Sequence, residues 1–388
     1  MRIALVLNDD FSMWQFRRGL IATLCRLGHT VYTITPPGPY VGHLEGLGAV
    51  HRPLRMYRFV SPLGDVRVLY ALYRTLRRDR IELVHNMTVK PTIYGALAAR
   101  LAGVPRVTAL VSGLGIPFMA GGPGRRLMRL TVRALYRFAL GLTDKVWFQN
   151  PEDLELFIAD GLVARSKAVL IRGSGVDLDE VSAERADRTT IGALRRELGL
   201  EQAGLVAVMV VARLIWSKGV REFKEAAHLL ARRCPDVRFV LVGPYEREHP
   251  DAVGGGYLEV DLPSNFTAVT RFREEVREIL ALGDIVVLPS YFREGVPRVL
   301  LEALSLGKPI VTTDHPGCRE TVEPHLNGHL VPVRDSSALA DAIADLAADA
   351  GKRQRFGAHS RRKAELEFDE RLVVRRVLRE IYGLDDAA

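Results

Sequence analysis

Two glutamates stand eight positions apart in the segment PSYFREGVPRVLLEAL. Glu294 lies in a loop that we expect to follow a strand, and Glu302 lies in the second turn of a helix that we expect to begin near Pro297. The backbone amides of Gly295 and Val296 then lie near the positive end of that helix, where an anion is stabilised. Because carboxylates beside a phosphate would repel it, we expect the glutamates to accept hydrogen bonds from sugar hydroxyls.

A second segment, VARLIWSKG, carries two cations at a strand-to-helix junction. Arg213 leaves the end of a strand, and Lys218 precedes Gly219 at the start of a helix. Two cations at such a junction suit a diphosphate. Either segment alone is also explained by solvated charges flanking a turn, but their occurrence on corresponding edges of one domain favours a substrate site.

The elements that position these residues are predicted by alternating strand and helix patterns. Buried strands such as RIALVL, TVYTIT and IELVHN are each followed by a helical pattern, and the same rhythm restarts at AGLVAVMVVAR. We therefore expect an α/β protein with two Rossmann-like, doubly wound domains that face each other across a cleft. The first domain is expected to comprise residues 1–180 and 365–388, the second residues 201–364, with a polar connector at 181–200.

Composition limits the classes of protein. Of 388 residues, 48% are apolar and 26% are charged, which excludes a disordered chain. No apolar run approaches the ~20 residues that span a bilayer, and the N-terminus lacks the pattern of a signal peptide. The three cysteines are far apart and form neither a disulfide framework nor a metal motif. We expect a cytoplasmic protein without a bound metal.

The net charge of +8 is concentrated in the first half, where residues 1–180 hold 24 Lys and Arg against 14 Asp and Glu. A basic amphipathic helix is expected at 124–142, and its arginines are Arg125, Arg126, Arg129, Arg133 and Arg137. Such a helix can lie on an anionic membrane, or it can cover a sheet with a solvated stripe of arginines. Nucleic acid is the rival partner, but we expect none because the sequence has no recognisable nucleic-acid module.

The two motif segments resemble the retaining nucleotide-sugar glycosyltransferases of family 4, which have the GT-B fold. Segments of the first half, including VHNMTVKPTIYG, WFQNPED and GSGVD, are similar to the bacterial subgroup that assembles lipid-linked glycans. The resemblance implies that Glu294 contacts the donor sugar and Glu302 the ribose. It also implies that Arg213 and Lys218 neutralise the donor diphosphate, and that the terminal helix packs on the first domain.

The same resemblance implies a UDP-sugar donor and a polyprenyl-diphosphate glycan acceptor, at the cytoplasmic face of the inner membrane. The sequence departs from the family pattern in two loops. The first-strand loop lacks a Gly-Gly pair, and the loop of Gly113 and Gly115 lacks a histidine that many members carry. With these two glycines, Arg17, His85 and Lys90 are our candidates for acceptor or phosphate contacts. His85 is equally well explained as a buried histidine with a hydrogen-bond partner, because it lies at the end of the IELVH strand.

Two other functions compete with transfer. A glycoside hydrolase could use Glu294 and Glu302 as an acid and base pair, although the cations would then have no purpose. A non-catalytic binding protein is the second alternative, favoured by the two departures from the family pattern. The Asp177-Leu178-Asp179 sequence resembles a metal motif of another glycosyltransferase fold, but its place after GSG favours a turn.

Overall fold

The chain forms two compact units, and the computed structural model describes residues 1–56, 62–115 and 123–384. The first unit comprises Met1–Gly175 and Glu370–Ala388, and the second comprises Val176–Asp369. The boundaries expected at residues 180 and 365 therefore lie a few residues from the observed ones. The expected connector, 181–200, belongs to the second unit, because Leu194, Leu198 and Leu200 of this polar segment pack into its core.

The first unit is built on a seven-stranded parallel sheet. Its strand order is β3 (Val50–Pro53), β2 (Thr30–Thr35), β1 (Arg2–Val6), β4 (Leu83–Met87), β5 (Arg106–Val111), β6 (Lys145–Phe148) and β7 (Ala168–Leu170). The residues of β1 and β4 are nearly all buried, as expected for strands covered on both faces. The edge strands β3 and β7 were not expected, because β3 is short and contains a proline and β7 has only three residues.

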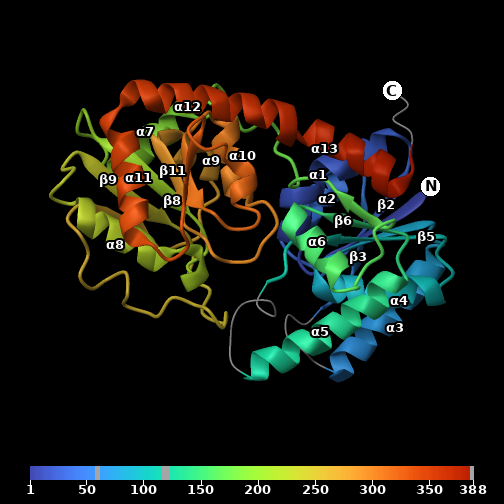
Figure 1. Ribbon diagram of the computed structural model, residues 1–388. Coiled ribbons are helices and arrows are strands. Elements are labelled where there is room, and N and C mark those ends of the chain that lie inside the picture. Colours follow the sequence, from blue (N-terminus) through green and yellow to red (C-terminus); the bar gives the residue numbers. More distant parts are fainter. Residues whose placement is uncertain (57–61, 116–122, 385–388) are drawn as a thin grey trace. The chain divides into compact units, whose positions relative to one another are not determined.

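Helices cover both faces of this sheet (Figure 1). They are α1 (Asp10–Arg26), α2 (Val41–Gly46), α3 (Pro62–Arg78), α4 (Val89–Leu101), α5 (Pro123–Gly141), α6 (Pro151–Ala159) and α13 (Glu370–Arg376), which continues as Val377–Tyr382. Helices α1, α2 and α13 pack on one face, and α3 and α4 pack on the other. The terminal helix packs on the first unit as predicted, because Val373, Val377 and Leu378 enter the core beneath α1.

The second unit has a six-stranded parallel sheet. Its order is β10 (Phe266–Val269), β9 (Val237–Val242), β8 (Val206–Val211), β11 (Ile285–Leu288), β12 (Ile310–Thr313) and β13 (Gly328–Val331). Strands β10 and β13 were not predicted, because four residues that include threonine or glycine give no readable pattern. The two doubly wound sheets confirm the expected fold class.

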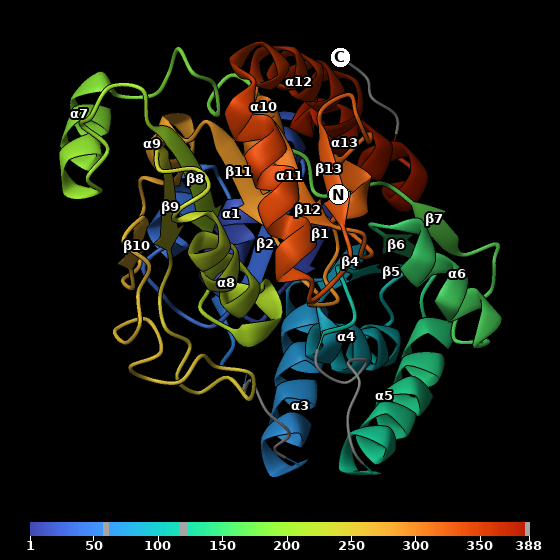
Figure 2. The same cartoon turned by 60° about the vertical axis from the view of Figure 1, so that its left-hand side comes forward.

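Helices also cover both faces of the second sheet (Figure 2). They are α7 (Arg188–Glu197), α8 (Val220–Leu230), α9 (Val276–Leu282), α10 (Arg298–Ser305), α11 (Ser336–Ala348) and α12 (Ala350–Lys363), which continues as Ala364–Phe368. Alternate residues of β11 enter opposite cores: Val287 packs with α8 and α11, and Val286 packs with α10. The loops that follow these parallel strands all lie at one edge of the sheet, where such folds bind ligands.

Candidate active site

A close approach of two loops builds the candidate site of the second unit. After β8, the chain makes one tight helical turn, Trp216–Lys218, and leaves it through Gly219 at a φ of 78°. A Cβ on Gly219 would lie 2.3 Å from the carbonyl oxygen of Pro289, so only glycine fits. The carbonyl of Ser217 consequently accepts hydrogen bonds from the Tyr291 amide at 2.8 Å and from Ser290 Oγ at 3.2 Å.

This approach places Lys218 against Glu294. Lys218 Nζ lies 2.5 Å from Glu294 Oε1, and the two side chains are only 9% and 21% exposed. Ser290 Oγ also lies 3.2 Å from the same carboxylate oxygen, so its single hydrogen is shared between Glu294 and the Ser217 carbonyl. Removing two charges from water is costly, so this pair stays stable only while each charge keeps a partner. An anion that reached Lys218 would therefore exchange with Glu294.

The loop after Glu294 leads into α10 and packs closely against a glycine. Gly295 and Val296 are buried, and Pro297 is the N-cap residue of α10, which begins at Arg298, one position after the start that we expected. The carbonyl oxygen of Gly295 would lie 1.7 Å from a Cβ on Gly317, which has a φ of 84°. The first turn of α10 is thus fixed against the β12 side of the sheet, with its amides at the positive end of the helix.

Glu302 lies one turn further along α10 and has a different cation. Arg298 Nε donates to Glu302 Oε1 at 2.8 Å, and both side chains are 9% exposed. The two glutamates that the sequence singled out are therefore held separately, Glu294 by Lys218 and Glu302 by Arg298. A hydrolase would need them to act as one facing pair, an arrangement that these separate contacts do not favour.

Arg213 lies near a carboxylate of a third loop. Its Nη1 atom is 3.9 Å from Glu246 Oε2, and its side chain is 41% exposed. The structure therefore joins Lys218 to Glu294 but gives Arg213 a looser, solvent-accessible partner. A surface pair of this kind contributes little stability, so the Arg213 guanidinium can move to a ligand at small cost.

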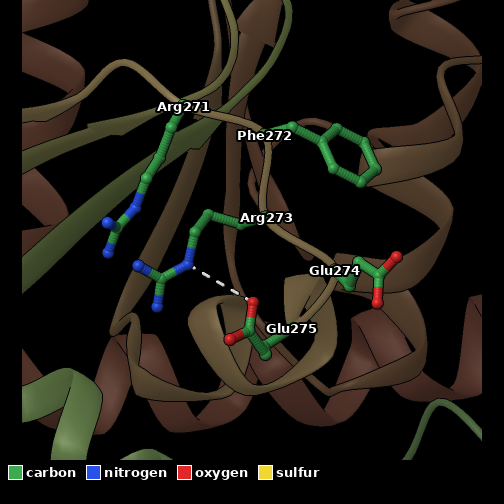
Figure 3. A pocket seen from close by; sticks show the side chains of 5 residues that line it. All are labelled: Arg271, Phe272, Arg273, Glu274 and Glu275. Atoms are coloured by element: carbon green, nitrogen blue, oxygen red, sulfur yellow. Dashed lines mark hydrogen bonds and ion pairs between the residues drawn. The ribbon is translucent and has the colours of Figure 1, made fainter.

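An open pocket of about 460 Å³ lies where β10 ends, at the same edge of the sheet. It is lined by Arg271, Phe272, Arg273, Glu274 and Glu275. Figure 3 shows the side chains of Arg271 and Arg273 on one side of the segment and the ring of Phe272 on the other. Glu197 of α7 binds both arginines at 2.8 Å. The 51% exposed Phe272 ring is the apolar part of this pocket, and the sequence pattern gave no sign of it.

In the first unit, Arg17 and His85 are packed within the core. Arg17 is 4% exposed, donates to Met87 Sδ at 3.1 Å, and lies 4.9 Å from the Trp147 ring centroid. His85 is fully buried, and its Nδ1 lies 2.8 Å from Thr108 Oγ1. Burial, with a smaller effect of Arg17, lowers the pKa of His85 to about 3, so its ring is neutral. Both side chains thus have packing roles in the core.

The other candidates of the first unit follow β4 and β5. Lys90 Nζ lies 2.7 Å from the buried Asp65, which also accepts a hydrogen bond from Tyr94 Oη at 3.0 Å. Gly113 and Gly115 have φ values of 117° and 60°, so the loop after β5 needs glycine at both positions. The structure gives Lys90 a structural partner and places the glycines at the sheet edge where ligands bind.

The remaining sequence motifs are also placed. Asp177 Oδ1 accepts the amide hydrogens of Asp179 and Glu180 at 3.0 Å, which confirms the expected turn. Among the described residues, no group of three or more His, Cys, Asp or Glu side chains could hold a metal ion. None of the described helices is long and apolar enough to cross a bilayer.

Comparisons with known proteins decide the family. Residues 206–349 match the model "Glycosyl transferases group 1", and residues 13–173 match "Glycosyl transferase 4-like domain". A UDP-Gal:alpha-D-GlcNAc-diphosphoundecaprenol alpha-1,3-galactosyltransferase of Escherichia coli is 30% identical over 309 residues, which are 79% of this chain and 76% of that protein. The chain belongs to this glycosyltransferase family.

A further relative and two solved structures align with nearly the whole chain. An N,N'-diacetylbacillosaminyl-diphospho-undecaprenol alpha-1,3-N-acetylgalactosaminyltransferase of Campylobacter jejuni is 27% identical over 383 residues, 98% of each chain. The structure of Anabaena Alr3699/HepE in complex with UDP and glucose aligns with a TM-score of 0.79 at 20% identity, covering 99% of this chain and 100% of that one. A glycosyltransferase from Rickettsia africae aligns with a TM-score of 0.80 at 18% identity, over 98% of each chain. These structures share the GT-B fold.

Sequence reasoning missed several polar residues of the candidate site. Ser217 and Ser290 join the two loops, and Arg298 holds Glu302. The Arg298–Glu302 pair had a readable signal, because oppositely charged residues four positions apart on a helix are neighbours. The serine contact had none, because it joins residues that are 73 positions apart in the chain.

Gly317 should be essential to the amide loop, and Gly204 provides a matched control. Both glycines have a φ of 84°, but a Cβ on Gly204 meets no atom within 4 Å. Gly204→Ala should cost only the strain of a left-handed alanine, about 1–2 kcal/mol. Gly317→Ala adds the clash with Gly295, so it should lower the thermal unfolding temperature further and weaken UDP binding in calorimetry. Equal effects of the two substitutions would contradict this account of the loop.

Proposed function

We propose that this glycosyltransferase moves a hexose or N-acetylhexosamine from a UDP-sugar to a polyprenyl-diphosphate-linked acceptor during the assembly of a cell-surface polysaccharide or glycan. The ion pair of Lys218 and Glu294 beside the first turn of α10 carries the proposal. The activities of the Campylobacter and Escherichia relatives support a lipid-diphosphate acceptor. The UDP in the HepE complex supports the choice of nucleotide.

The proposed donor complex exchanges partners at this ion pair. The diphosphate takes Lys218 Nζ from Glu294 and meets the amides of Gly295 and Val296. The freed Glu294 carboxylate then accepts hydrogen bonds from hydroxyls of the sugar. The exchange preserves a partner for each buried charge, which is what makes it energetically accessible.

The same groups would stabilise the transition state. As the bond between the sugar and the phosphate breaks, negative charge grows on the leaving diphosphate. Lys218, Arg213 and the start of α10 are positively charged groups at that position, so they bind the transition state more tightly than the ground state. We propose that the acceptor attacks from the same face, that the leaving phosphate oxygen takes its proton, and that the sugar configuration is retained.

The pocket at the end of β10 supports a place for the nucleoside. Strand β9 separates β10 from β8, so the two strand ends are about 10 Å apart. A nucleotide whose diphosphate lies at Lys218 could extend along the sheet edge and place its base against Phe272. Glu302 remains the candidate for the ribose.

Removing either member of the ion pair should abolish most of the turnover. Lys218→Gln and Glu294→Gln should each lower kcat by roughly 100- to 1,000-fold, the range for losing one group that stabilises charge in a transition state. The assay is acceptor-dependent release of UDP from a panel of UDP-sugars, with circular dichroism to verify folding. Lys352→Gln, which removes an ion pair to Asp345 elsewhere in the same unit, is the control. Turnover near that of the wild type in both variants would refute the site.

We also propose that transfer needs no metal ion, since positive side chains neutralise the diphosphate. Treatment with EDTA should leave the rate of UDP release within twofold of the untreated enzyme. A loss of activity that Mg²⁺ or Mn²⁺ restores would show that the side chains do not suffice.

The basic face of α5 supports peripheral binding to the cytoplasmic face of the inner membrane. Arg126 and Arg137 are exposed, Arg129 is half-buried, and Arg133 pairs with Asp160 at 2.7 Å. The Arg125 side chain lies outside the described residues. Between these arginines, Leu130 and Phe138 are 62% and 55% exposed. Cations interleaved with exposed apolar side chains are typical of a helix that lies on an anionic bilayer.

Neutralising three arginines of α5 should release the protein from anionic vesicles. Each cation at such a surface contributes about 1 kcal/mol, so the triple change of Arg126, Arg129 and Arg137 to Gln should weaken binding to phosphatidylglycerol vesicles by roughly 100-fold. The same change at Arg232, Arg355 and Arg362 of the second unit removes equal charge and should have little effect. Equal losses in the two variants would show that only net charge matters.

A further inference from the structure

A third cation lies at the edge of the second sheet that holds the candidate site. Both cations expected from the sequence have carboxylate partners there: Lys218 pairs with Glu294, and Arg213 lies near Glu246. Arg334, in the loop after β13, is exposed, and it forms no ion pair with any residue in the part of the chain that the structure describes. Its positive charge is therefore available to a ligand without the loss of an ion pair.

Backbone and ring contacts hold this side chain in place. Arg334 has a φ of 61°, a left-handed conformation that is unfavourable for a residue with a Cβ. Its neighbour Asp335 caps α11 by accepting the Ala338 amide hydrogen at 2.8 Å. The Arg334 guanidinium carbon lies 4.5 Å from the centroid of the Tyr291 ring. A guanidinium stacked on an aromatic ring is oriented before a ligand arrives, so less entropy is lost on binding.

The Tyr291 ring belongs to the loop that forms the candidate site. The Tyr291 amide donates a hydrogen bond of 2.8 Å to the carbonyl of Ser217, the residue that immediately precedes Lys218 in the chain. Ser290, the preceding residue, donates to Glu294. Helices α8 and α11 lie side by side on this face of the sheet (Figure 2), which brings the two loops together. Arg334 thus contacts the ring of a residue that lies next to both members of the ion pair: its amide bonds to Ser217, which precedes Lys218, and it follows Ser290, which bonds to Glu294.

The neighbouring carboxylates do not neutralise Arg334 fully. Glu222 of α8 is only 5% exposed, and burial raises its pKa. Asp251 accepts the Ser217 amide hydrogen at 2.9 Å, so its charge is already engaged by backbone. Glu225 accepts a hydrogen bond from Ser336 at 2.5 Å. Each of these carboxylates has its own burial or hydrogen-bond partner, and none of them forms an ion pair with Arg334, so the guanidinium stays available to an anion.

We propose that Arg334, stacked on Tyr291, binds a phosphate group of a substrate at this site. The inference rests on the proposed function, which supplies two sources of that phosphate: the diphosphate of the nucleotide donor and the diphosphate of the lipid-linked acceptor. The planar guanidinium offers two parallel N–H donors to phosphate oxygens, a geometry that a lysine ammonium cannot reproduce. Tyr291 is a positioning residue that fixes the plane of the guanidinium.

Substitutions at both positions test this role. A hydrogen bond to a charged group is typically strong enough that Arg334→Gln should raise the KM of the affected substrate by about 10-fold or more. Arg334→Lys should recover only part of the lost substrate affinity, because it restores the positive charge without the two parallel N–H donors. Tyr291→Phe should behave as the wild type, whereas Tyr291→Leu should raise the same KM. Arg362→Gln, an exposed arginine of the same unit outside the site, is the matched control.

The arms of the experiment separate the two sources of phosphate. A weaker UDP affinity of Arg334→Gln in calorimetry, with a raised KM for the donor, supports the donor diphosphate. An unchanged UDP affinity with a raised KM for the acceptor supports the acceptor diphosphate. Unchanged values for both substrates, in a protein whose UDP affinity is weakened by Lys218→Gln, would overturn the role of Arg334 and leave the proposed function intact. A wild-type chain without affinity for UDP would contradict both.

Discussion

The candidate site depends on one ion pair that is kept mostly out of water. Lys218 and Glu294 come from loops 76 positions apart, and they meet because Gly219 lets its backbone approach Pro289 closely. Gly317 fixes the other side of the same loop beneath Gly295. Neither charge could stay in this place alone, because an unpaired buried charge costs several kcal/mol. The site is thus built to accept a ligand that can replace one partner and engage the other.

This constraint explains why an anion and a group rich in hydroxyls would suit the site together. A phosphate satisfies Lys218, and a sugar hydroxyl satisfies Glu294. A molecule with only one of these features would leave the other charge poorly compensated in a half-buried place. A nucleotide sugar carries both features next to each other, at the bond that the glycosyltransferase family breaks. The proposed chemistry therefore depends on the exchange of partners at one pair of side chains.

The first unit uses its polar residues differently. Arg17 stacks on Trp147 beneath the terminal helix, and the neutral His85 bonds to Thr108 in the middle of the sheet. Lys90 is held by Asp65. These side chains have partners within the first unit, and exposed arginines lie on the helices α3 and α5. The division is consistent with a unit that presents a surface and a second unit that holds the reactive groups.

The sequence was sufficient to predict the two sheets, because strands such as β1 and β8 are continuous apolar runs. Glu294 and Lys218 were also predicted, since a strand-to-helix junction is a local pattern. The residues that contact Arg213 and Arg334 could not be predicted, because the Arg213 contact with Glu246 and the Arg334 contact with Tyr291 join separate loops. Burial of Arg17 was equally hidden, because only the packed terminal helix and sheet reveal it, whereas the place of His85 at the end of a buried strand already favoured a core position.

The affinity of the Glu294→Gln variant for UDP alone tests the exchange of partners most directly. If Glu294 competes with the diphosphate for Lys218, removing its charge should leave UDP binding as tight as in the wild type or tighter, although UDP carries no sugar. Lys218→Gln should weaken the same binding. Calorimetry in which Glu294→Gln weakens UDP binding as much as Lys218→Gln would contradict the account, because the carboxylate would then act as a support of the nucleotide site and not as its competitor.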